Sequence, residues 1–370
     1  NSGVWIMAYT TIDDPSAHFQ TVLWTGNAAD GSGGQTQAIT FDGNSDMQPD
    51  WVWVKQRSAA AKNHIVDSSR GVSQRIVSNN SDGEDDQGSN NGVYQFNSDG
   101  FNVGTFGRGV NDVSKTYVAW CWKANGATTT TNDASATSVG TIDSVYQANT
   151  TAGFSIVTWT GTGSNGSIAH GLGVVPDLII SKSRGHAENW AVYHKNSNST
   201  PEDYYLALDD TRAATDSAIV WNDTAPTSSV ISIGTQDKIN KSGSTHIAYC
   251  FNQIKGYSDF GIYVGNYSTD GPFVYTGFKP ALVIVKKSSA AGGDWRITDH
   301  KRDPDNIVEG RLKPNESDAE DTNDQFDFLS NGFKVKAAAG DINTNDAEHI
   351  YIAFAENPFV SSKGTPTTAR

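Results

Sequence analysis

The sequence is poor in several residue types, and each shortage excludes a class of protein. Only two of its 370 residues are cysteines, Cys121 and Cys250, so no disulfide framework is expected, and neither has a second Cys or a His at metal-ligand spacing. No apolar run approaches the ~20 residues needed to cross a bilayer, which excludes membrane insertion by a helix. Charged residues make up only 18%, and no stretch sustains the 3.6-residue apolar period of long helices. The shortages exclude a helical protein and a disulfide scaffold.

Basic residues are also scarce, with 27 Lys and Arg against 41 Asp and Glu and a net charge of −14. Nucleic acids and anionic membrane surfaces both select faces rich in Lys and Arg, so neither partner is expected. The negative charge favours solubility, even at high protein density. The chain begins at Asn1 without a methionine and shows no signal-peptide pattern, so we expect a processed or partial chain.

The residues that are abundant predict an all-β fold. Ten Trp and thirteen Tyr suit the pleated, half-buried surface of a sheet. The 36 glycines, together with many Asn and Asp, supply the left-handed conformations that tight turns require.

One pattern occurs three times along the chain. Each copy opens with an aromatic-led strand running to a glycine, at Phe19–Gly26, Phe154–Gly161 and Phe260–Gly265. A proline then precedes an apolar strand closed by lysine, as in PDWVWVK (49–55), PDLIISK (176–182) and PALVIVK (280–286). Each copy closes with an aromatic strand around an alanine, taken as Ala119, Ala248 and Ala353. The nearly constant spacing from the proline to the alanine predicts three tandem copies of one domain.

About eight short strand-like segments per copy, separated by turn residues, predict a sandwich, and eight is the jelly-roll number. We therefore expect three separately packed antiparallel β-sandwiches with jelly-roll-like winding. The expected organisation is listed here in chain order: repeat 1 with an N-terminal strand at 1–125, a Thr/Ser-rich linker at 126–149, repeat 2 at 150–256, repeat 3 at 257–357 and a tail at 358–370. Because the join between repeats 2 and 3 is much shorter than the linker, those two repeats should pack more rigidly than repeats 1 and 2.

Segments in all three copies resemble a repeat of structural proteins of tailed bacteriophages, particularly tail-fibre and virion proteins of marine phages. The resembling segments are 14–26, 48–55 and 117–124 in copy 1, 170–178 and 221–229 in copy 2, and 268–278 and 355–359 in copy 3. The resemblance covers nearly the whole chain and implies a component of the virion surface. It implies no catalytic or receptor-binding motif.

Candidate catalytic residues are few. His64, Asp67 and Ser68 are the residue types of a nucleophilic triad. Counted from the closing lysine, however, His64 falls where copies 2 and 3 carry Trp190 and Trp295. A position that exchanges His for Trp is a packing position, and there is no Gly-x-Ser-x-Gly elbow. We expect no catalytic residues and no enzyme activity.

Candidate ligand sites are weak as well. The acidic loops 82–86 and 318–321 contain ligands suited to Ca²⁺, with Asp209 and Asp210 nearby in copy 2, but their spacing is not that of an EF-hand. We expect solvated loops and no cofactor, with Ca²⁺ as the alternative. Trp24, Trp159 and Trp221 are candidates for stacking on sugars, although core positions are favoured for each. The two cysteines are expected to be small buried hydrophobic residues.

These observations predict a bacteriophage virion structural protein on the virion surface, a tail fibre or a head-decorating fibre with an adhesive or spacer role. The alternatives are a lectin-like carbohydrate-binding protein and, third, a polysaccharide depolymerase. The expected partners are other virion proteins, a host surface glycan or receptor, and further copies of the chain, for example in a trimer. Contacts should lie in loops that differ among the copies, since binding residues concentrate on such loops. These loops are 27–46, 196–203, 224–229 and 301–309, together with the tail.

Overall fold

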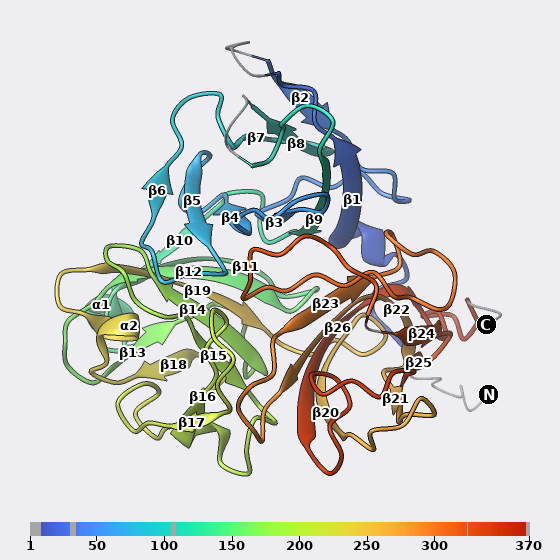
Figure 1. Cartoon of the computed structure of the whole chain (residues 1–370). Helices are drawn as coiled ribbons and strands as arrows, with labels where there is room; N and C mark the ends of the chain where they lie inside the picture. The colour runs from blue at the N-terminus through green and yellow to red at the C-terminus, as the bar shows by residue number, and fades with distance from the viewer. Residues whose placement is uncertain (1–8, 30–34, 105–108, 324, 368–370) are drawn as a thin grey trace, which may run out of the picture.

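The computed structural model describes residues 9–367, apart from 30–34, 105–108 and 324. The chain is all-β, and its sheets are built from antiparallel strand pairs, as the sequence predicts (Figure 1). The two α-helices of the described residues, α1 (Ala134–Thr137) and α2 (Asp237–Asn240), have four residues each. No described helix is long and apolar enough to cross a membrane.

Each copy is a sandwich of a larger and a smaller sheet. In copy 1 the larger sheet has the order β1-β9-β3-β4-β5-β6 and the smaller one β2-β8-β7. The elements are η1 (Pro15–Ala17), β1 (Phe19–Thr25), β2 (Gln37–Ile39), β3 (Trp51–Gln56), β4 (His64–Asp67), β5 (Gln74–Val77), β6 (Asp85–Asp86), β7 (Val93–Asn97), β8 (Gly100–Val103) and β9 (Thr116–Trp122). The first strand pairs with the last and the second with the last but one, which is the nested order of a jelly-roll-like winding.

Copies 2 and 3 repeat this order. Copy 2 has a larger sheet β10-β11-β12-β19-β14-β15 and the pairs β13-β18 and β16-β17, and copy 3 has β20-β26-β22-β23 and β21-β25-β24. The elements of copy 2 are β10 (Thr130–Asn132), α1, β11 (Ser144–Asn149), β12 (Phe154–Thr160), β13 (Gly166–Ala169), β14 (Leu178–Ser183), β15 (Ala191–His194), η2 (Pro201–Asp203), β16 (Tyr204–Tyr205), β17 (Thr215–Asp216), β18 (Val230–Ile233), α2 and β19 (Thr245–Phe251). Those of copy 3 are β20 (Ser258–Val264), β21 (Phe273–Tyr275), β22 (Phe278–Lys287), β23 (Arg296–Asp299), β24 (Phe326–Leu329), β25 (Gly332–Val335) and β26 (Glu348–Pro358).

The larger sheets are buried on both faces because their strands are apolar at successive positions. In β3, Val52 and Val54 pack between the two sheets of copy 1, whereas Trp51 and Trp53 point to the opposite face, since side chains alternate along a strand. Copies 2 and 3 have the same arrangement, each with its own core between its sheets. The second face of each larger sheet therefore has to be covered by something outside the sandwich.

That cover is the other two copies, so the sandwiches are not packed separately as expected. The outward faces of the three larger sheets form one common core at the centre of the molecule (Figure 1). Phe251 lies at the hub, with ring centroids 5.8 Å from Trp51 of copy 1, 4.5 Å from Phe154 of copy 2 and 5.6 Å from Phe354 of copy 3. Trp51, Leu178 and Leu282, the recurring sheet residues, are core residues as predicted.

Three buried lysines mark the seams where one copy meets the next. Lys55, Lys182 and Lys286 close equivalent strands, and each is buried. Their ammonium groups donate to backbone carbonyls of a neighbouring copy: Lys55 to Ser317, Lys182 to Ser81 and Lys286 to Thr211. We call these contacts seam 3/1, seam 1/2 and seam 2/3. They close the three copies into a ring.

A second set of polar contacts repeats around the ring with different side chains. Asp67 in seam 1/2 is bound by Arg70 and accepts a hydrogen bond of 2.7 Å from the Tyr249 hydroxyl of copy 2. Asp299 in seam 3/1 is bound in the same way by Arg302 and accepts one of 2.9 Å from Trp120 Nε1 of copy 1.

At seam 2/3, both residues of the equivalent contact are replaced. The residue of copy 3 that corresponds to Trp120 and Tyr249 is Ile352, which has no polar side-chain atom. In place of the aspartate, copy 2 has His194, whose Nε2 lies 3.2 Å from the Tyr351 carbonyl oxygen. A buried carboxylate without a partner would be costly, and the histidine avoids that cost.

Residues 126–149 are not a free linker. Strands β10 and β11 extend the larger sheet of copy 2, with β11 paired to β12. Gln147 of β11 donates to the hydroxyls of Ser68 and Ser69, and Asp50 accepts from the backbone N–H groups of Gly126 and Ala127. Strands β10 and β11 are short and are held largely by hydrogen bonds, so their polar composition resembles that of a linker. The prediction that copies 2 and 3 pack more rigidly than copies 1 and 2 rested on the lengths of the two joins, and these contacts tie copy 1 to copy 2 as well.

The described part of the tail also contacts the body. Ser362 donates to Asp13, and the N–H of Phe359 donates 3.2 Å to the Gly277 carbonyl. The N-terminal strand expected in repeat 1 falls partly on residues 1–8, which lie outside the described residues. From Tyr9 to His18 the one regular element is η1.

Two positions of the repeat alignment need correction. Strand pairing makes Tyr351, not Ala353, the equivalent of Ala119 and Ala248, although all three lie on equivalent strands. A shift of two residues keeps every side chain on the same face, so the apolar pattern does not reveal it. Likewise Asn63, not His64, is equivalent to Trp190 and Trp295. All three donate to carbonyls across a seam: Asn63 to Pro314, Trp190 to Val77 and Trp295 to Ala207.

Candidate functional site

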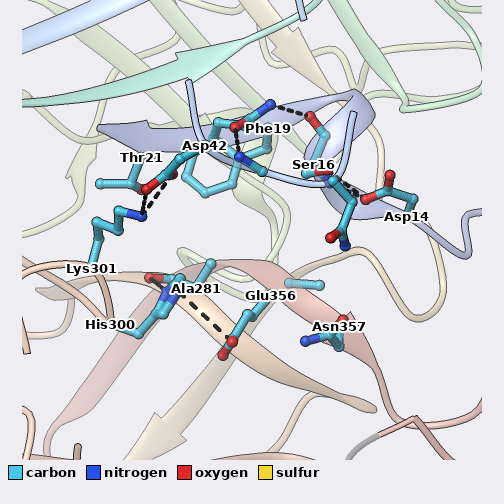
Figure 2. Close-up of a pocket in the computed structure, with 14 residues that line it drawn as sticks. Asp14, Ser16, Phe19, Thr21, Asp42, Ala281, His300, Lys301, Glu356 and Asn357 are labelled. Carbon is cyan, nitrogen blue, oxygen red and sulfur yellow. Dashed lines mark hydrogen bonds and ion pairs between the residues drawn. The ribbon is translucent and has the colours of Figure 1, made fainter. Parts of the chain in front are cut away.

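A hollow of about 200 Å³ lies at seam 3/1, between the start of copy 1 and the sheet end of copy 3 (Figure 2). Copy 1 contributes η1, the beginning of β1 and the loop at 42–44. Copy 3 contributes Ala281, His300 and Lys301 together with the end of β26. Figure 2 shows the side chains of the two copies facing each other across this space.

The wall from copy 1 is fixed by short polar contacts. Asp14 caps η1, and its carboxylate accepts from the hydroxyls of Ser16 and Ser45, each at 2.6 Å. Burial acts to raise the pKa of Asp14, but these hydrogen bonds outweigh it and hold the pKa below its usual value. Gln20 joins the same loop by donating 2.9 Å to the Ser45 carbonyl and accepting 3.0 Å from the Gly43 N–H. This wall is therefore preorganised and carries a negative charge.

The wall from copy 3 carries both signs of charge. Glu356 pairs with Lys279 at 2.7 Å and lies 3.9 Å from His300 Nε2. Lys301 crosses the seam to Asp42 at 2.6 Å and so bridges the two walls. Charged groups of both signs and hydrogen-bond donors and acceptors thus face one small volume.

A second, larger hollow of about 590 Å³ shares His300 with the first and is also lined by Lys279, the partner of Glu356. It is lined by the 303–308 loop and by β24. Asp303 holds the loop by accepting from the N–H groups of Glu309 and Gly310, and Asn306 exchanges hydrogen bonds with the Phe328 backbone. Together the two hollows form one polar surface, which we call the 3/1 groove.

Strand β11 explains why the groove occurs at this seam. Ser68 and Ser69 of copy 1 occupy the positions that His300 and Lys301 have in copy 3. At seam 1/2, Gln147 of β11 covers these serines. In copy 2, β11 pairs with one edge of β12. Among the described residues, no strand pairs with the equivalent edge of β1 in copy 1, so the corresponding surface at seam 3/1 is left open.

The groove is suited to binding a polar, hydroxyl-rich molecule. Most small-molecule sites are concave and contain a few fixed polar groups, and the groove has carboxylates, an ammonium, an imidazole and amides. Glu356 is engaged by Lys279 and His300.

The structure does not bring His64, Asp67 and Ser68 together as a triad. His64 Nε2 lies 3.4 Å from Arg75, Asp67 is bound by Arg70 and Tyr249, and the Ser68 hydroxyl donates 2.6 Å to Asp50. Each side chain is engaged by a different partner. Asp67 and Asp50 also contact residues of copy 2, through the Tyr249 hydroxyl and through the backbone N–H groups of Gly126 and Ala127. These contacts could not be predicted from one copy alone.

The acidic loops have a structural role at the seams. Glu84 binds Arg184 of copy 2 at 2.9 Å, and Glu320 accepts hydrogen bonds from both Nε and Nη2 of Arg57 of copy 1. Both loops therefore join one copy to the next and are not simply solvated. In copy 2, Ala214 holds the corresponding position and Asp210 pairs with Arg212. Asp209 accepts from the N–H of Trp190, and burial raises its pKa to about 6.

The tryptophans and cysteines are buried in the cores. Trp24 and Trp159 donate to the carbonyls of Val110 and Ile239, and Trp221 is 2% exposed. None of the three is placed to stack on a sugar at the surface. Cys121 and Cys250 are free and buried, and burial raises the pKa of both thiols.

Two of the four loops predicted to carry contacts meet at the groove. Asp42 comes from loop 27–46, of which 30–34 lies outside the described residues, and Lys301 comes from loop 301–309. Loops 196–203 and 224–229 belong to copy 2 and do not line the groove. Sequence reasoning missed His300, which directly precedes loop 301–309, and Glu356, which lies in β26, because no motif marks either residue. Loops 27–46 and 301–309 also bury Ile39, Phe41 and Val308, so they are not free of the core.

One protein-family model matches residues 14–358, and its description reads "Domain of unknown function (DUF7483)". The match begins before β1 and ends with β26, so it covers all three copies as one unit. Neither a curated protein nor a solved structure matches the chain.

Proposed function

The chain belongs to the DUF7483 family, and we propose that it is a structural protein of a tailed-bacteriophage virion, a tail fibre or head-decorating fibre that serves as spacer and adhesive. The observation that carries the proposal is the closed ring of three sandwiches around one core. Such a body resists bending because every seam combines apolar packing with buried hydrogen bonds. A rigid block with polar loops on its surface is what a fibre needs between its points of attachment.

Three further features support this assignment. The repeat segments resemble those of phage virion proteins. The net charge of −14 favours solubility at high protein density. Asp67 of the candidate triad and Glu84 and Glu320 of the acidic loops make contacts between copies.

The proposal is tested by locating the protein on particles. Antibodies raised against the purified chain, applied to phage particles from the source culture, should label one fixed position in electron micrographs. Mass spectrometry of gradient-purified particles should recover the chain in a constant ratio to the major capsid protein. Recovery of the chain only from the soluble fraction, with unlabelled particles, would refute the assignment.

A second candidate function, carbohydrate binding, is favoured by the 3/1 groove. Its mixed charges and amide groups match the hydrogen-bonding needs of a glycan better than those of an apolar ligand. A glycan array probed with the whole chain tests it. We expect His300→Ala and Asn306→Ala to lose the signal while Lys195→Ala, the equivalent of His300 in copy 2, retains it. An array without signal, or one unaffected by the groove variants, would exclude this candidate and leave the structural one untouched.

A further inference from the structure

Copy 2 contains a cluster of metal-binding side chains near seam 1/2. One ligand atom each from His186, Glu188 and Asp237 lies within 4.8 Å of the other two. His186 and Glu188 come from the loop after β14, and Asp237 begins α2, which packs against β14. Two elements in contact thus bring an imidazole and two carboxylates to one point.

Two hydroxyl groups hold the imidazole of His186 in place. His186 Nδ1 lies 2.7 Å from the Ser183 hydroxyl and 2.9 Å from the Ser244 hydroxyl. His186 Nε2 is buried and has no hydrogen-bond partner. Histidines that bind metals usually use one ring nitrogen as ligand and the other in such an orienting hydrogen bond.

Glu188 is fixed by its backbone. Its N–H donates 2.8 Å to the Ser81 carbonyl across seam 1/2, and its carbonyl accepts 2.8 Å from Lys182 Nζ. The loop therefore does not have to become ordered when the cluster takes up a ligand. One competitor is present, because Lys241 lies 3.6 Å from Asp237, but that pair is exposed and exposed pairs are weak.

The cluster is specific to copy 2. After the equivalent strand-closing lysine and the next two residues, copies 1 and 3 continue with Ser-Ala-Ala, at 58–60 and 289–291. Copy 2 has Gly185-His186-Ala187-Glu188 there. The sandwich and its seams form without these side chains in copies 1 and 3, so the fold does not require them.

We propose that His186, Glu188 and Asp237 bind one divalent first-row transition-metal ion, with Zn²⁺ as the ion the donor set fits best. Zn²⁺ accepts imidazole nitrogens and carboxylate oxygens as ligands, whereas Ca²⁺ takes six to eight oxygens. Three protein ligands leave a coordination position for water or for an outside donor group. Because Asp237 is exposed, this position faces solvent.

The test uses the full chain without an affinity tag, stripped with a chelator and dialysed. Isothermal titration with ZnCl₂ should give one site per chain, and Co²⁺ should give a visible absorption spectrum of the bound ion. His186→Asn, Glu188→Gln and Asp237→Asn should each weaken Zn²⁺ binding by roughly tenfold or more, and His186→Asn should abolish the Co²⁺ spectrum. Lys241→Gln removes the competing ammonium and should bind Zn²⁺ at least as tightly as the parent chain.

Two controls keep the outcome interpretable. Glu202→Gln removes an acid of the same copy outside the cluster and should leave Zn²⁺ binding unchanged. Each variant should unfold at the parent temperature in the presence of chelator, since copies 1 and 3 fold without these side chains. Equal Zn²⁺ binding by the parent and His186→Asn chains would overturn the proposal, as would a response to Ca²⁺ without one to Zn²⁺.

Discussion

The common core makes a sharp prediction about unfolding, which Phe251→Ala tests. Phe251 is 2% exposed and contacts aromatic rings of all three copies. Truncating a buried phenylalanine to alanine costs about 3–5 kcal/mol. A small cavity, of about 10 Å³ and lined by residues of all three copies, already exists at this point, so the substitution enlarges a void that the rigid sheets have little freedom to close.

The loss of stability in Phe251→Ala should extend to all three copies. Native-state hydrogen exchange measures it, because amides in central strands open only when the body unfolds globally. In Phe251→Ala, the amides of β9, β19 and β26 should all exchange faster by a similar factor, roughly a thousandfold for a loss of about 4 kcal/mol. Phe251→Leu should change all three strands in the same direction by less.

Phe333→Leu is the matched control, because Phe333 is fully buried but packs against Tyr263, Phe326 and Tyr351, all within copy 3. If the body is one cooperative unit, Phe333→Leu should also lower the protection of amides against exchange in β9, β19 and β26. Faster exchange confined to β19 in Phe251→Ala, or to β26 in Phe333→Leu, would show that the sandwiches unfold independently and would refute the reasoning.

The remaining predictions concern the seams and their buried charges. Burial lowers the pKa of His194 to about 3 and those of His246 and His349 to about 4. Between these values and 6.5 the unfolded chain binds protons that the folded chain does not, so stability should fall as pH falls from 7 to 5, by about 2 kcal/mol per histidine. Asp209, with its raised pKa of about 6, opposes this by about 1.4 kcal/mol, because here the folded chain takes up the proton. Urea titrations at both pH values measure the net loss, which should shrink in His194→Gln; a stability independent of pH would contradict it. Tyr249→Phe removes the hydroxyl donated to the buried Asp67 and should cost about 1.5–3 kcal/mol. Tyr263→Phe, whose hydroxyl donates to the neutral Ile342 carbonyl, should cost only about 0.5–1.5 kcal/mol, and equal losses would argue against a charged seam contact.

The sequence predicted what a single copy determines. The order of aromatic strands and turns located the repeats. Strands such as 51–54 and 117–122 are apolar at successive positions, so the alternation of side chains makes both of their faces apolar. The same alternation contained the evidence for the common core, because a sandwich buries only one face of each sheet. Without coordinates, however, an apolar second face does not say which sheet covers it.

The seams could not be predicted because their partners lie far apart in the chain and differ between copies. Asp67 meets Tyr249, Asp299 meets Trp120, and His194 meets a backbone carbonyl of copy 3. Because the paired residues differ at each seam, no recurring pair of residue types marks the seams in the sequence. Loops 27–46 and 301–309 were selected from the sequence as variable, but the groove itself was not predicted, because the meeting of these loops at seam 3/1 depends on how the ring closes.

The ring changes where function can reside on this chain. If the copies were independent, each would present the same edge and the same loops, and a ligand site would be expected three times. In the closed ring the three equivalent seams are made different by what surrounds them. Gln147 of β11 covers the equivalent of the groove at seam 1/2, and Lys195 and Asn196 replace His300 and Lys301 at seam 2/3. Among the described residues, the cluster of His186, Glu188 and Asp237 appears in copy 2 alone. Equivalent buried residues thus supply the rigidity of the shared fold, while the groove and the cluster lie at positions where the copies have diverged. A family model that spans all three copies is consistent with this division, because a single sandwich would lack both its central cover and the neighbour that completes each site.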